Sequence, residues 1–528
     1  MTHWNDGYIT DIVYTSNYYR ETSPVWLATA SLVLGHRPPD LSKPFRYADL
    51  GCGHGFTALT VAATCPNAEV WAFDFNPAHV ESGRIMAQRA GLTNIRFQEA
   101  SFADIAAMDD SALPEFDFIV SHGVISWVSP ENRNHLLSII GRRLRPGGLA
   151  YLSYNVLTGW AGMVPIQRLI QQLARNSQDR SDVTAGQVLA YLDRLKDGGA
   201  AFFPATPEAT KRLDEVRRND TRYVAHELFN ADWNPLMFSD VAEAMAAMKC
   251  TFIGSATLTE NIDSVSVPPG VQTLMADAKT TIMRETLRDF GIAQGFRRDI
   301  YRRGAPPLPP FEHQALLNDL ELAWTGRQPE DPFTLATAVG TLTGSSDVYK
   351  PLLDILVKGP LSIRDVRELE PFAGKPLVEL LQAVTLLLAA GYAQPMLPQG
   401  GTAAGRDATE RLNRVVTNIH VTGAEIPRVV VPITGSALNI DLLETVTIGV
   451  ILAGHGPDIP TIARHVLAEL TSSNRSVQRE GKPITDPADA LSVVIEIVTT
   501  FMTVRLGFWQ RLGVLPPPRP VKNPRASR

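Results

Sequence analysis

Cysteine is scarce in this chain, which has three cysteines in 528 residues. They show no CxxC spacing, so the sequence excludes a disulfide framework and a cysteine-based zinc site. His226-Glu227 would need a second histidine four residues after the first to form a zinc helix, and Asn230 stands there instead. We therefore expect no metal ion. The low cysteine content fits a reducing compartment, and we predict a cytoplasmic protein.

No apolar run of membrane-spanning length is free of charged residues. The two best candidates, Leu438–Gly454 and Leu491–Trp509, each carry two charged residues. We predict that both are buried helices of a soluble domain and that the chain has no membrane span. The first six residues lack the basic-then-apolar pattern of a signal peptide.

An excess of positive charge is also missing. The chain has 49 Lys and Arg against 55 Asp and Glu, a net charge of −6. Nucleic-acid-binding proteins usually carry a basic surface, so we expect no nucleic-acid partner. A Walker A sequence and a Gly-x-Ser-x-Gly elbow are both absent, which disfavours nucleotide hydrolysis by a P-loop and serine hydrolase chemistry.

Residues 46–155 alternate strand-like and helix-like segments. Such alternation predicts a parallel, doubly wound sheet. Two later strand-like runs, 251–256 and 296–301, are expected to complete a mostly parallel seven-stranded α/β sheet, with a helical insertion before them and mainly helical domains after them. The predicted strands are 46–50, 69–73, 95–98, 116–121 and 149–154, and the predicted helices are 56–64, 77–90 and 130–144.

A glycine-rich loop at residues 49–55 follows the first predicted strand and reads Asp-Leu-Gly-Cys-Gly-His-Gly. Glycines there let backbone N–H groups approach a ligand closely. A dinucleotide fingerprint needs Gly-x-Gly-x-x-Gly, but Gly51, Gly53 and Gly55 bring the third glycine one residue early. Asp49 would repel a pyrophosphate and attract an ammonium group, so it favours S-adenosylmethionine, which has an amino-acid end. A tight turn that binds nothing is the alternative.

Asp74 ends the second predicted strand. A carboxylate at this place can accept hydrogen bonds from both ribose hydroxyls of either NAD or S-adenosylmethionine. The alternative is a surface aspartate that caps the helix beginning at Asn76-Pro77. Phe75 is expected to pack on the adenine face.

These segments together resemble a class I methyltransferase. The resemblance rests on the glycine loop, Asp74, the segment 99–104 (Glu-Ala-Ser-Phe-Ala-Asp) and the segment 144–148 (Leu-Arg-Pro-Gly-Gly). It implies S-adenosyl-L-methionine as the cofactor and an adenine-binding segment after the third strand. Ser101 and Phe102 stand at the expected place there and Asp104 stands slightly late. Which of them meets the adenine amine is left open.

A narrower resemblance is to bacterial methyltransferases with a regulatory domain, a group that includes the rickettsial outer-membrane-protein lysine methyltransferases. It covers roughly residues 8–305 well. It implies a protein or peptide substrate that is methylated on a lysine amine. The segments that carry it are Tyr14–Pro24, Ser121–Val128, Tyr151–Trp160 and His226–Phe238.

Several aromatic residues are expected at the carboxyl ends of strands, where open α/β sheets bind ligands. His122 and Trp127 follow the fourth strand, Tyr154 follows the fifth, and Tyr19 precedes the fold and is expected to fold over the cofactor. Ordinary packing is the alternative for each. Together they predict an aromatic-lined opening that suits a lysine stem and a cationic amine.

A lysine amine has a free pKa near ~10.4, so it must lose a proton before it attacks the methyl group. We treat His122, Trp127 and Tyr154 as candidate catalytic residues. His122 is the candidate proton acceptor or positioning group, and transfer to bulk water is the alternative. His122 is also a candidate cofactor-binding residue.

Two other functions remain open from the sequence. One is a small-molecule methyltransferase in which the helical insertion, 160–248, caps a closed pocket. The other is a non-catalytic regulatory protein that binds S-adenosylmethionine. A deep cavity too narrow for a peptide would favour the first, and failure to bind the cofactor would undermine both enzyme hypotheses.

Length alone predicts two to four domains. Residues 345–398 contain five Lys and Arg against six Asp and Glu, so a winged-helix-like module there favours protein contact or a homodimer over DNA binding. The predicted ranges are 1–45 (cofactor-covering segment), 46–159 (methyltransferase core), 160–305 (helical insertion and regulatory domain completing the sheet), 306–344 (linker), 345–399 (winged-helix-like module), 400–515 (helical domain, opened by a flexible Gly400–Gly405) and 516–528 (disordered tail).

Overall fold

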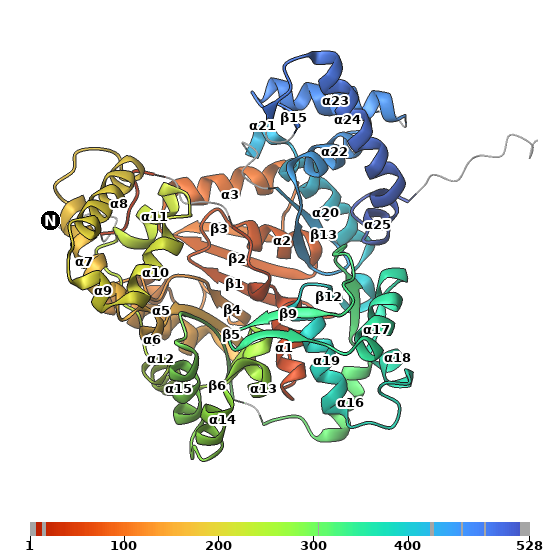
Figure 1. Ribbon diagram of the computed structural model, residues 1–528. Coiled ribbons are helices and arrows are strands. Elements are labelled where there is room, and N and C mark those ends of the chain that lie inside the picture. The colour runs from red at the N-terminus through yellow and green to blue at the C-terminus, as the bar shows by residue number, and fades with distance from the viewer. Residues whose placement is uncertain are drawn as a thin grey trace, which may run out of the picture.

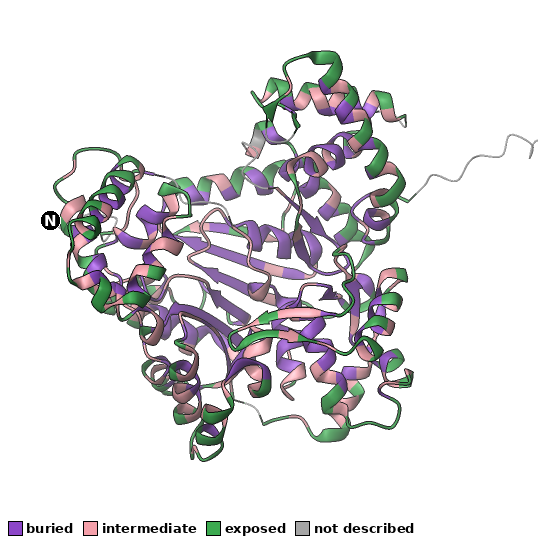
Figure 2. Ribbon diagram, viewed as in Figure 1, coloured by how far each residue is buried: buried purple, intermediate pink, exposed green. Residues whose placement is uncertain are grey.

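The computed structural model describes residues 7–12, 17–304, 306–422, 427–455, 458–479 and 482–517. A central sheet lies between a lobe of short helices and a larger C-terminal part (Figure 1). The sheet is almost entirely buried, whereas the outer faces of both flanking parts are exposed (Figure 2). Tyr14 and the predicted tail beyond residue 517 lie outside the described residues.

The central sheet has seven strands in the order β3-β2-β1-β4-β5-β7-β6. Its first five strands are parallel, and β7 runs antiparallel to both β5 and β6. This confirms the predicted α/β sheet of a class I methyltransferase. The strands are β1 Phe45–Leu50, β2 Ala68–Asp74, β3 Ile95–Glu99, β4 Phe116–Ser121, β5 Leu144–Asn155, β6 Cys250–Ser255 and β7 Phe296–Arg303.

Both faces of the sheet are covered, because neighbouring side chains along a strand point to opposite sides. On β1, Tyr47 belongs to one hydrophobic cluster and Ala48 to another. The Tyr47 side also packs against the C-terminal modules. Helices of the Tyr47 side are α1 Pro24–Val33, α2 Phe56–Thr64 and α3 Pro77–Arg89, and those of the Ala48 side include α4 Phe102–Ala107, α5 Pro130–Arg143 and α12 Phe238–Ala247.

Local capping signals explain where the core helices begin. The Asn76 side chain accepts a hydrogen bond from the amide of Ala78, and Pro77 occupies the first turn of α3. Ser129 caps α5 in the same way, ahead of Pro130. These helices match their predicted ranges within one residue at each end.

The helical insertion forms a lobe with its own hydrophobic core. Trp127 of the methyltransferase core and Ile12 of the N-terminal segment belong to this cluster, so the lobe is attached to both. Its helices are α6 Leu157–Trp160, α7 Met163–Ala174, α8 Ser181–Asp197, α9 Phe202–Ala205, α10 Pro207–Val216 and α11 Thr221–Leu228. Between β6 and β7 lie η2 Leu258–Asn261, α13 Asp263–Ser266, α14 Pro269–Ala276 and α15 Thr281–Ile292.

The sequence predicts a linker over 306–344, whereas the structure has regular elements there: α16 Pro310–Asn318, β8 Glu321–Trp324, β9 Thr334–Thr337 and β10 Gly340–Thr343. The prolines do break the chain, but Pro310 then occupies the first turn of α16, where proline is well tolerated. The strand β8 is only four residues long and is stabilised by partners that are distant in sequence.

The module over 345–399 contains α17 Ser346–Lys358, β11 Leu361–Ser362, α18 Ile363–Glu368, α19 Leu377–Ala389 and β12 Ala393–Pro395. Its three-stranded sheet has the order β11-β8-β12, so β8 from the predicted linker is its central strand. The third strand of this sheet, β12, follows α19 and pairs antiparallel with β8.

The remaining C-terminal residues are mainly helical. The prediction of a flexible Gly400–Gly405 is wrong for its last residues, because Thr402 caps a helix that begins at Ala403. The elements are η3 Pro398–Gly400, α20 Ala403–Val416, α21 Ile419–Thr422, β13 Arg428–Val431, β14 Ser436–Asn439, α22 Leu442–Leu452, α23 Ile459–Ser472, β15 Gln478–Arg479, β16 Lys482–Pro483, α24 Pro487–Thr500, η4 Phe501–Arg505 and α25 Leu506–Arg511.

The last three helical segments run on as one stretch, Pro487–Arg511, which by length and composition could cross a membrane. Only 22% of its most apolar window is buried, so it is less buried than the sequence predicts. Its inner side packs against α23. Near its end, Arg505 forms an ion pair with Glu444, and the indole N–H of Trp509 donates to the same carboxylate. The stretch is therefore anchored to α22 by polar contacts as well as by apolar packing.

Candidate functional site

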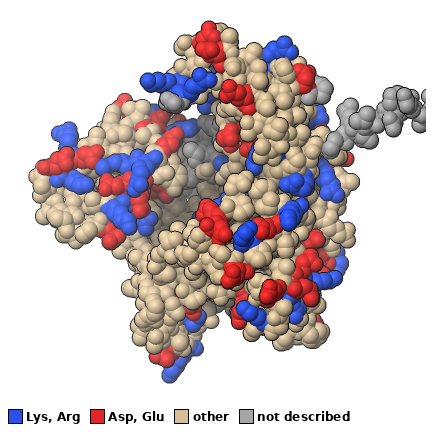
Figure 3. Space-filling model, turned by 45° about the vertical axis from the view of Figure 1, so that its right-hand side comes forward, with Lys and Arg blue, Asp and Glu red and all other residues tan. Residues whose placement is uncertain are grey.

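A cavity of about 660 Å³ lies at the carboxyl ends of β1, β2, β4 and β5. The N-terminal segment, α11 and the start of β7 complete its walls. Figure 3 shows the surface hollowed between the helical lobe and the C-terminal part. Among the predicted site residues, those that line the cavity are Tyr19, Asp49, Gly51, Gly53, Gly55, Asp74, Phe75, Ser101, Phe102, His122 and Trp127.

The glycine loop joins β1 to α2 through positive φ angles at all three glycines. A Cβ atom on Gly55 would lie 2.2 Å from Cε1 of Phe97, so no side chain fits there. A Cβ atom on Gly53 would meet no atom within 4 Å and would instead occupy open space. The loop is thus packed tightly from behind and leaves room in front, as a ligand cradle requires.

Asp49 is 6% exposed at the end of β1. Burial raises the pKa of its carboxyl to about 7, and the nearby Asp74 carboxylate adds to the effect. An ammonium group placed here would favour the ionised carboxylate. The geometry therefore fits the amino-acid end of S-adenosylmethionine better than a phosphate.

Asp74 is oriented by the backbone around it. Its Oδ2 accepts a hydrogen bond from the amide of Gly53 at 2.8 Å, and its Oδ1 accepts one from the amide of Asn76 at 2.9 Å. Nδ1 of His79 lies 3.3 Å from Oδ1. The carboxylate is thereby held beside the glycine loop, where it can receive ribose hydroxyls.

The part of the cavity that the sequence predicts to bind adenine contains Ser101 and Phe102 at the start of α4. Ser101 and Asp104 form a capping box, in which the serine hydroxyl and amide both donate to Oδ2 of Asp104. Asp104 does not line the cavity. Phe75 also lines the cavity, with its ring edge-to-face to Tyr8 at 5.6 Å between centroids.

His122 is held as a neutral, positioned ring. Its Nδ1 lies 2.8 Å from the hydroxyl of Tyr151 and 3.1 Å from Oγ of Ser153. Tyr19 stacks on its face at 3.6 Å between centroids. Burial, with the positive charge of Arg298, lowers the pKa of His122 to about 3, which makes it a weak proton acceptor. The structure thus favours its positioning role.

The candidate catalytic role of Tyr154 is wrong. Its ring is fully buried on the far side of β5, and its hydroxyl donates to Oδ2 of Asp299 at 2.6 Å. Side chains alternate along a strand, so Ser153 and Asn155 point toward the cavity side and Tyr154 points away. The hydroxyl near His122 is that of Tyr151.

Trp127 lines the cavity and also fixes part of its wall. Its indole N–H donates to the backbone carbonyl of Glu227 at 3.3 Å. The Glu227 side chain, on α11, lines the cavity and is hydrogen bonded to Tyr223. Burial raises the pKa of Glu227 to about 7. Its charge in turn contributes to raising the pKa values of Tyr8, Tyr19 and Tyr223, so it lies among these rings.

Sequence reasoning missed several lining residues, namely Tyr8, Trp160, Arg212, Tyr223, Glu227, Phe296 and Arg298. They come from the N-terminal segment, the insertion and β7, which are far from the glycine loop in sequence. The pair His226-Glu227 could have indicated a site residue, because Glu227 stands beside the buried positions of an amphipathic helix. Within the described ranges, no group of three or more His, Cys, Asp or Glu side chains could hold a metal ion.

Comparisons with known proteins agree with this geometry. A family model described as a methyltransferase domain matches residues 48–148, and one described as a predicted methyltransferase regulatory domain matches residues 220–303. The chain belongs to the class I S-adenosylmethionine-dependent methyltransferases that carry a methyltransferase regulatory domain. Its cofactor is S-adenosyl-L-methionine.

Some relatives match nearly the whole length of this chain, and others match only part of it. Uncharacterized protein sll1526 of Synechocystis is 30% identical over 97% of this chain and 99% of its own. The structure of PKMT2 from Rickettsia typhi in complex with AdoHcy matches with a TM-score of 0.69 at 19% identity, covering 95% of this chain and 99% of that one, and shows the same fold. Trans-aconitate 2-methyltransferase of Methylobacterium radiotolerans is 28% identical over 44% of this chain and 78% of its own.

Proposed function

We propose that this methyltransferase transfers the methyl group of S-adenosylmethionine to the side-chain amine of a lysine in a protein. The observation that carries the proposal is the Glu227 carboxylate, which lines the cavity among the rings of Tyr8, Tyr19 and Tyr223. A lysine offers what these groups bind, because it has an apolar stem and a cationic tip.

Glu227 can act on the amine in two ways. Ionised, it attracts the ammonium group of the incoming lysine across a short, poorly hydrated distance. The same carboxylate can then accept a proton, because its pKa is raised to about 7 and desolvation lowers the pKa of the amine. His122 is unsuited to this step, since its pKa is lowered to about 3.

The cofactor, when bound, supplies a sulfonium methyl group that an uncharged amine can displace. The chain contributes binding, orientation and exclusion of water. Asp49, the glycine loop and Asp74 would hold the two ends of the cofactor. The stacked Tyr19 and His122 rings line the same cavity as these groups and Glu227.

Two likenesses support a protein acceptor. The segments Tyr14–Pro24 and His226–Phe238 resemble those of the rickettsial outer-membrane-protein lysine methyltransferases. The fold matches PKMT2 of Rickettsia typhi over almost the full length of both chains.

The test incubates the protein with labelled S-adenosylmethionine and whole-cell protein, followed by mass spectrometry of the labelled polypeptides. We expect methylated lysine. With S-adenosylmethionine saturating, so that ionisation of Asp49 does not contribute, kcat/KM for the protein substrate should rise with pH through about 7 as Glu227 ionises. The Glu227→Gln variant should lose at least about tenfold in kcat/KM and lose that acid limb. A Glu131→Gln variant on the surface of α5 serves as the control. Label confined to small molecules would contradict the proposal.

A small-molecule acid is the second candidate acceptor. The cavity wall carries Arg298 as well as Glu227, and trans-aconitate 2-methyltransferase is among the relatives. The same labelling experiment distinguishes the two, because this candidate puts the label in the soluble small-molecule fraction as a methyl ester.

A further inference from the structure

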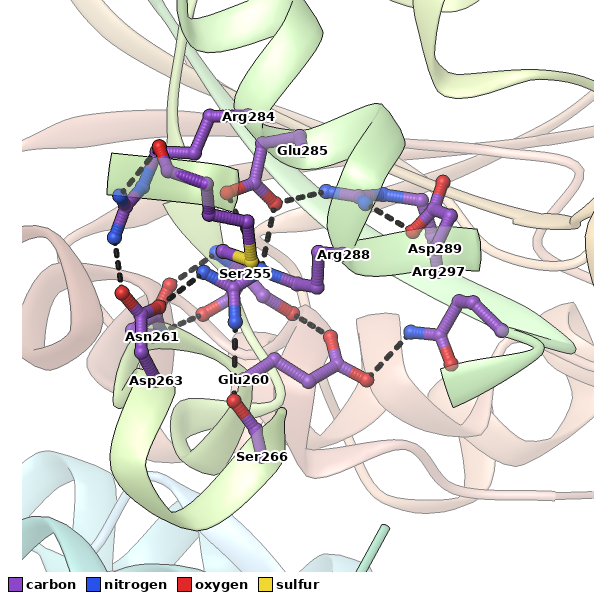
Figure 4. A network of polar contacts seen from close by, with 12 residues as sticks. Ser255, Glu260, Asn261, Asp263, Ser266, Arg284, Glu285, Arg288, Asp289 and Arg297 are labelled. Carbon is purple, nitrogen blue, oxygen red and sulfur yellow. Dashed lines mark hydrogen bonds and ion pairs between the residues drawn. The ribbon is translucent and has the colours of Figure 1, made fainter. Parts of the chain in front are cut away.

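Two neighbouring arginines on β7 have opposite surroundings. Arg297 is 1% exposed and faces away from the cavity. Its guanidinium donates to Asp289 at 2.6 Å, Asp299 at 2.8 Å and Glu285 at 3.0 Å. Figure 4 shows Arg297 beside Glu285 and Asp289 within a larger network that includes Arg288. The regulatory domain therefore supplies this cation with three carboxylates.

Arg298 faces the cavity and has no comparable partners. Its Nη1 donates to Oγ1 of Thr257 at 3.2 Å, and its guanidinium lies 5.1 Å from the ring centre of Phe296. Over the ranges that the structure describes, it forms no ion pair, and its buried Nε has no hydrogen-bond acceptor. A buried donor without an acceptor costs free energy, so this position is unusual unless a ligand completes it.

A second donor on the same wall is also unsatisfied. Asn155, the last residue of β5, lines the cavity and is 2% exposed. Its backbone is fixed, because its amide donates to Oγ of Ser126 at 3.0 Å and its carbonyl accepts from the amide of Leu236 at 2.8 Å. Yet its side-chain Nδ2 has no acceptor among the described residues.

The strand register brings these two donors together. Ser153 pairs with Arg298 and Asn155 pairs with Phe296 in the antiparallel β5–β7 ladder. Asn155 and Arg298 are therefore diagonal neighbours on one face, with Cβ atoms about 7–8 Å apart, a separation that a long side chain spans. Since Ser153 on this face contacts His122, the two donors lie on the same cavity wall as His122.

We propose that Arg298 and Asn155 form a carboxylate-binding site in the wall of the cavity. A carboxylate offers two oxygens, which can accept from a guanidinium and an amide together. Asp49, itself a carboxylate, cannot provide this contact. The bound carboxylate is either the α-carboxylate of the cofactor or a carboxylate of the methyl acceptor. If the cofactor supplies the carboxylate, the site does not depend on which acceptor the enzyme uses.

Calorimetry with two ligands tests the cofactor as the source. The probes are S-adenosylhomocysteine and its decarboxylated analogue, in which only the carboxylate is missing. If the cofactor carboxylate occupies the site, wild-type protein binds S-adenosylhomocysteine about 10- to 100-fold more tightly than the analogue. Arg298→Met should remove most of that preference, Asn155→Ala part of it, and Arg298→Lys should retain some of it.

Titration of glutarate into protein saturated with S-adenosylhomocysteine tests the acceptor as the source. In that case wild-type protein shows no preference between the two cofactor analogues but binds glutarate, and Arg298→Met binds it at least about tenfold more weakly. Arg145→Met is the matched control, because this arginine lies outside the cavity, pairs with Asp117 and should leave both carboxylate readouts unchanged.

The proposal is overturned if wild-type protein neither prefers S-adenosylhomocysteine over its decarboxylated analogue nor binds glutarate. It is also overturned if Arg298→Met changes neither that preference nor the affinity for glutarate. An unfolded variant would bind neither analogue, whereas loss of the carboxylate site alone leaves binding of the decarboxylated analogue intact. None of these measurements requires methyl transfer or a lysine substrate. Failure of the lysine proposal would therefore leave the result standing, and the reverse also holds.

Discussion

Among the single residues of the site, Asp49 connects cofactor binding to pH. Its carboxyl has a pKa raised to about 7 by burial, so it is protonated below that pH and ionised above it. Only the ionised form attracts the cofactor ammonium group. We expect the affinity for S-adenosylhomocysteine to rise about tenfold between pH 6 and pH 8. Calorimetry across this range measures it, and Asp49→Asn should bind weakly and without that slope.

Asp74 makes a second residue-level prediction. Asp74→Ala removes the acceptor of the Gly53 amide and the expected ribose partner together, so the Kd for S-adenosylhomocysteine should rise at least about tenfold. Glu81→Ala, an exposed change on the neighbouring helix α3, is the control. Unchanged binding in Asp74→Ala would mean that the cofactor lies elsewhere in the cavity.

Sequence reasoning found the residues of this site that belong to one local motif and missed those that only the fold assembles. Asp49 and Asp74 end neighbouring strands, so their positions followed from the strand pattern. The predicted catalytic role of Tyr154 is wrong because the face to which a side chain points depends on the register of β5, which the aromatic pattern does not reveal. Glu227 and Arg298 reach the cavity from α11 and β7, across sequence separations that no motif bridges.

At the scale of one element, the β1–α2 loop separates folding from binding. Gly55→Ala places a methyl group against the Phe97 ring in a left-handed conformation, and should destabilise the protein by about 2–4 kcal/mol. Gly53→Ala has open space around the new methyl group, so strain alone should cost about 1–2 kcal/mol. That methyl group occupies cofactor space, and binding should weaken at least about tenfold.

Thermal unfolding measures the loss of stability in the two variants, and calorimetry measures their affinity for S-adenosylhomocysteine. A Gly53→Ala protein that binds S-adenosylhomocysteine as tightly as wild type would contradict the cradle. A Gly55→Ala protein with the melting temperature of the wild type would show that Phe97 moves aside without a cost in stability.

Elements with local start and stop signals were also those predicted best. Pro77 and Pro130 mark the first turns of α3 and α5, and capping side chains precede them. The short strand β8 has no such signal. Its stability comes from pairing with β11 and β12, which are distant in sequence. The proline-rich segment ahead of it therefore predicts only a linker.

For the whole molecule, the methyltransferase sheet and the C-terminal modules share one hydrophobic cluster. Leu387 of α19 and Tyr47 of β1 both belong to it and are fully buried. Leu387→Ala should therefore destabilise both parts together, by about 2–5 kcal/mol. Differential scanning calorimetry with cofactor present should show one transition that shifts as a unit. Two transitions, with only one of them shifted, would show that the parts unfold independently.

The position of β7 has a consequence for how the protein is made. This strand lies between β5 and β6, yet it is the last of the seven in the sequence. A nascent chain that has formed β5 keeps an open edge until everything between Asn155 and Phe296 has been synthesised, on the order of ten seconds at about 5–20 residues per second. During that interval the exposed edge can pair with other chains. Pausing or slowing translation within the insertion should therefore increase aggregation of this protein more than pausing after residue 303.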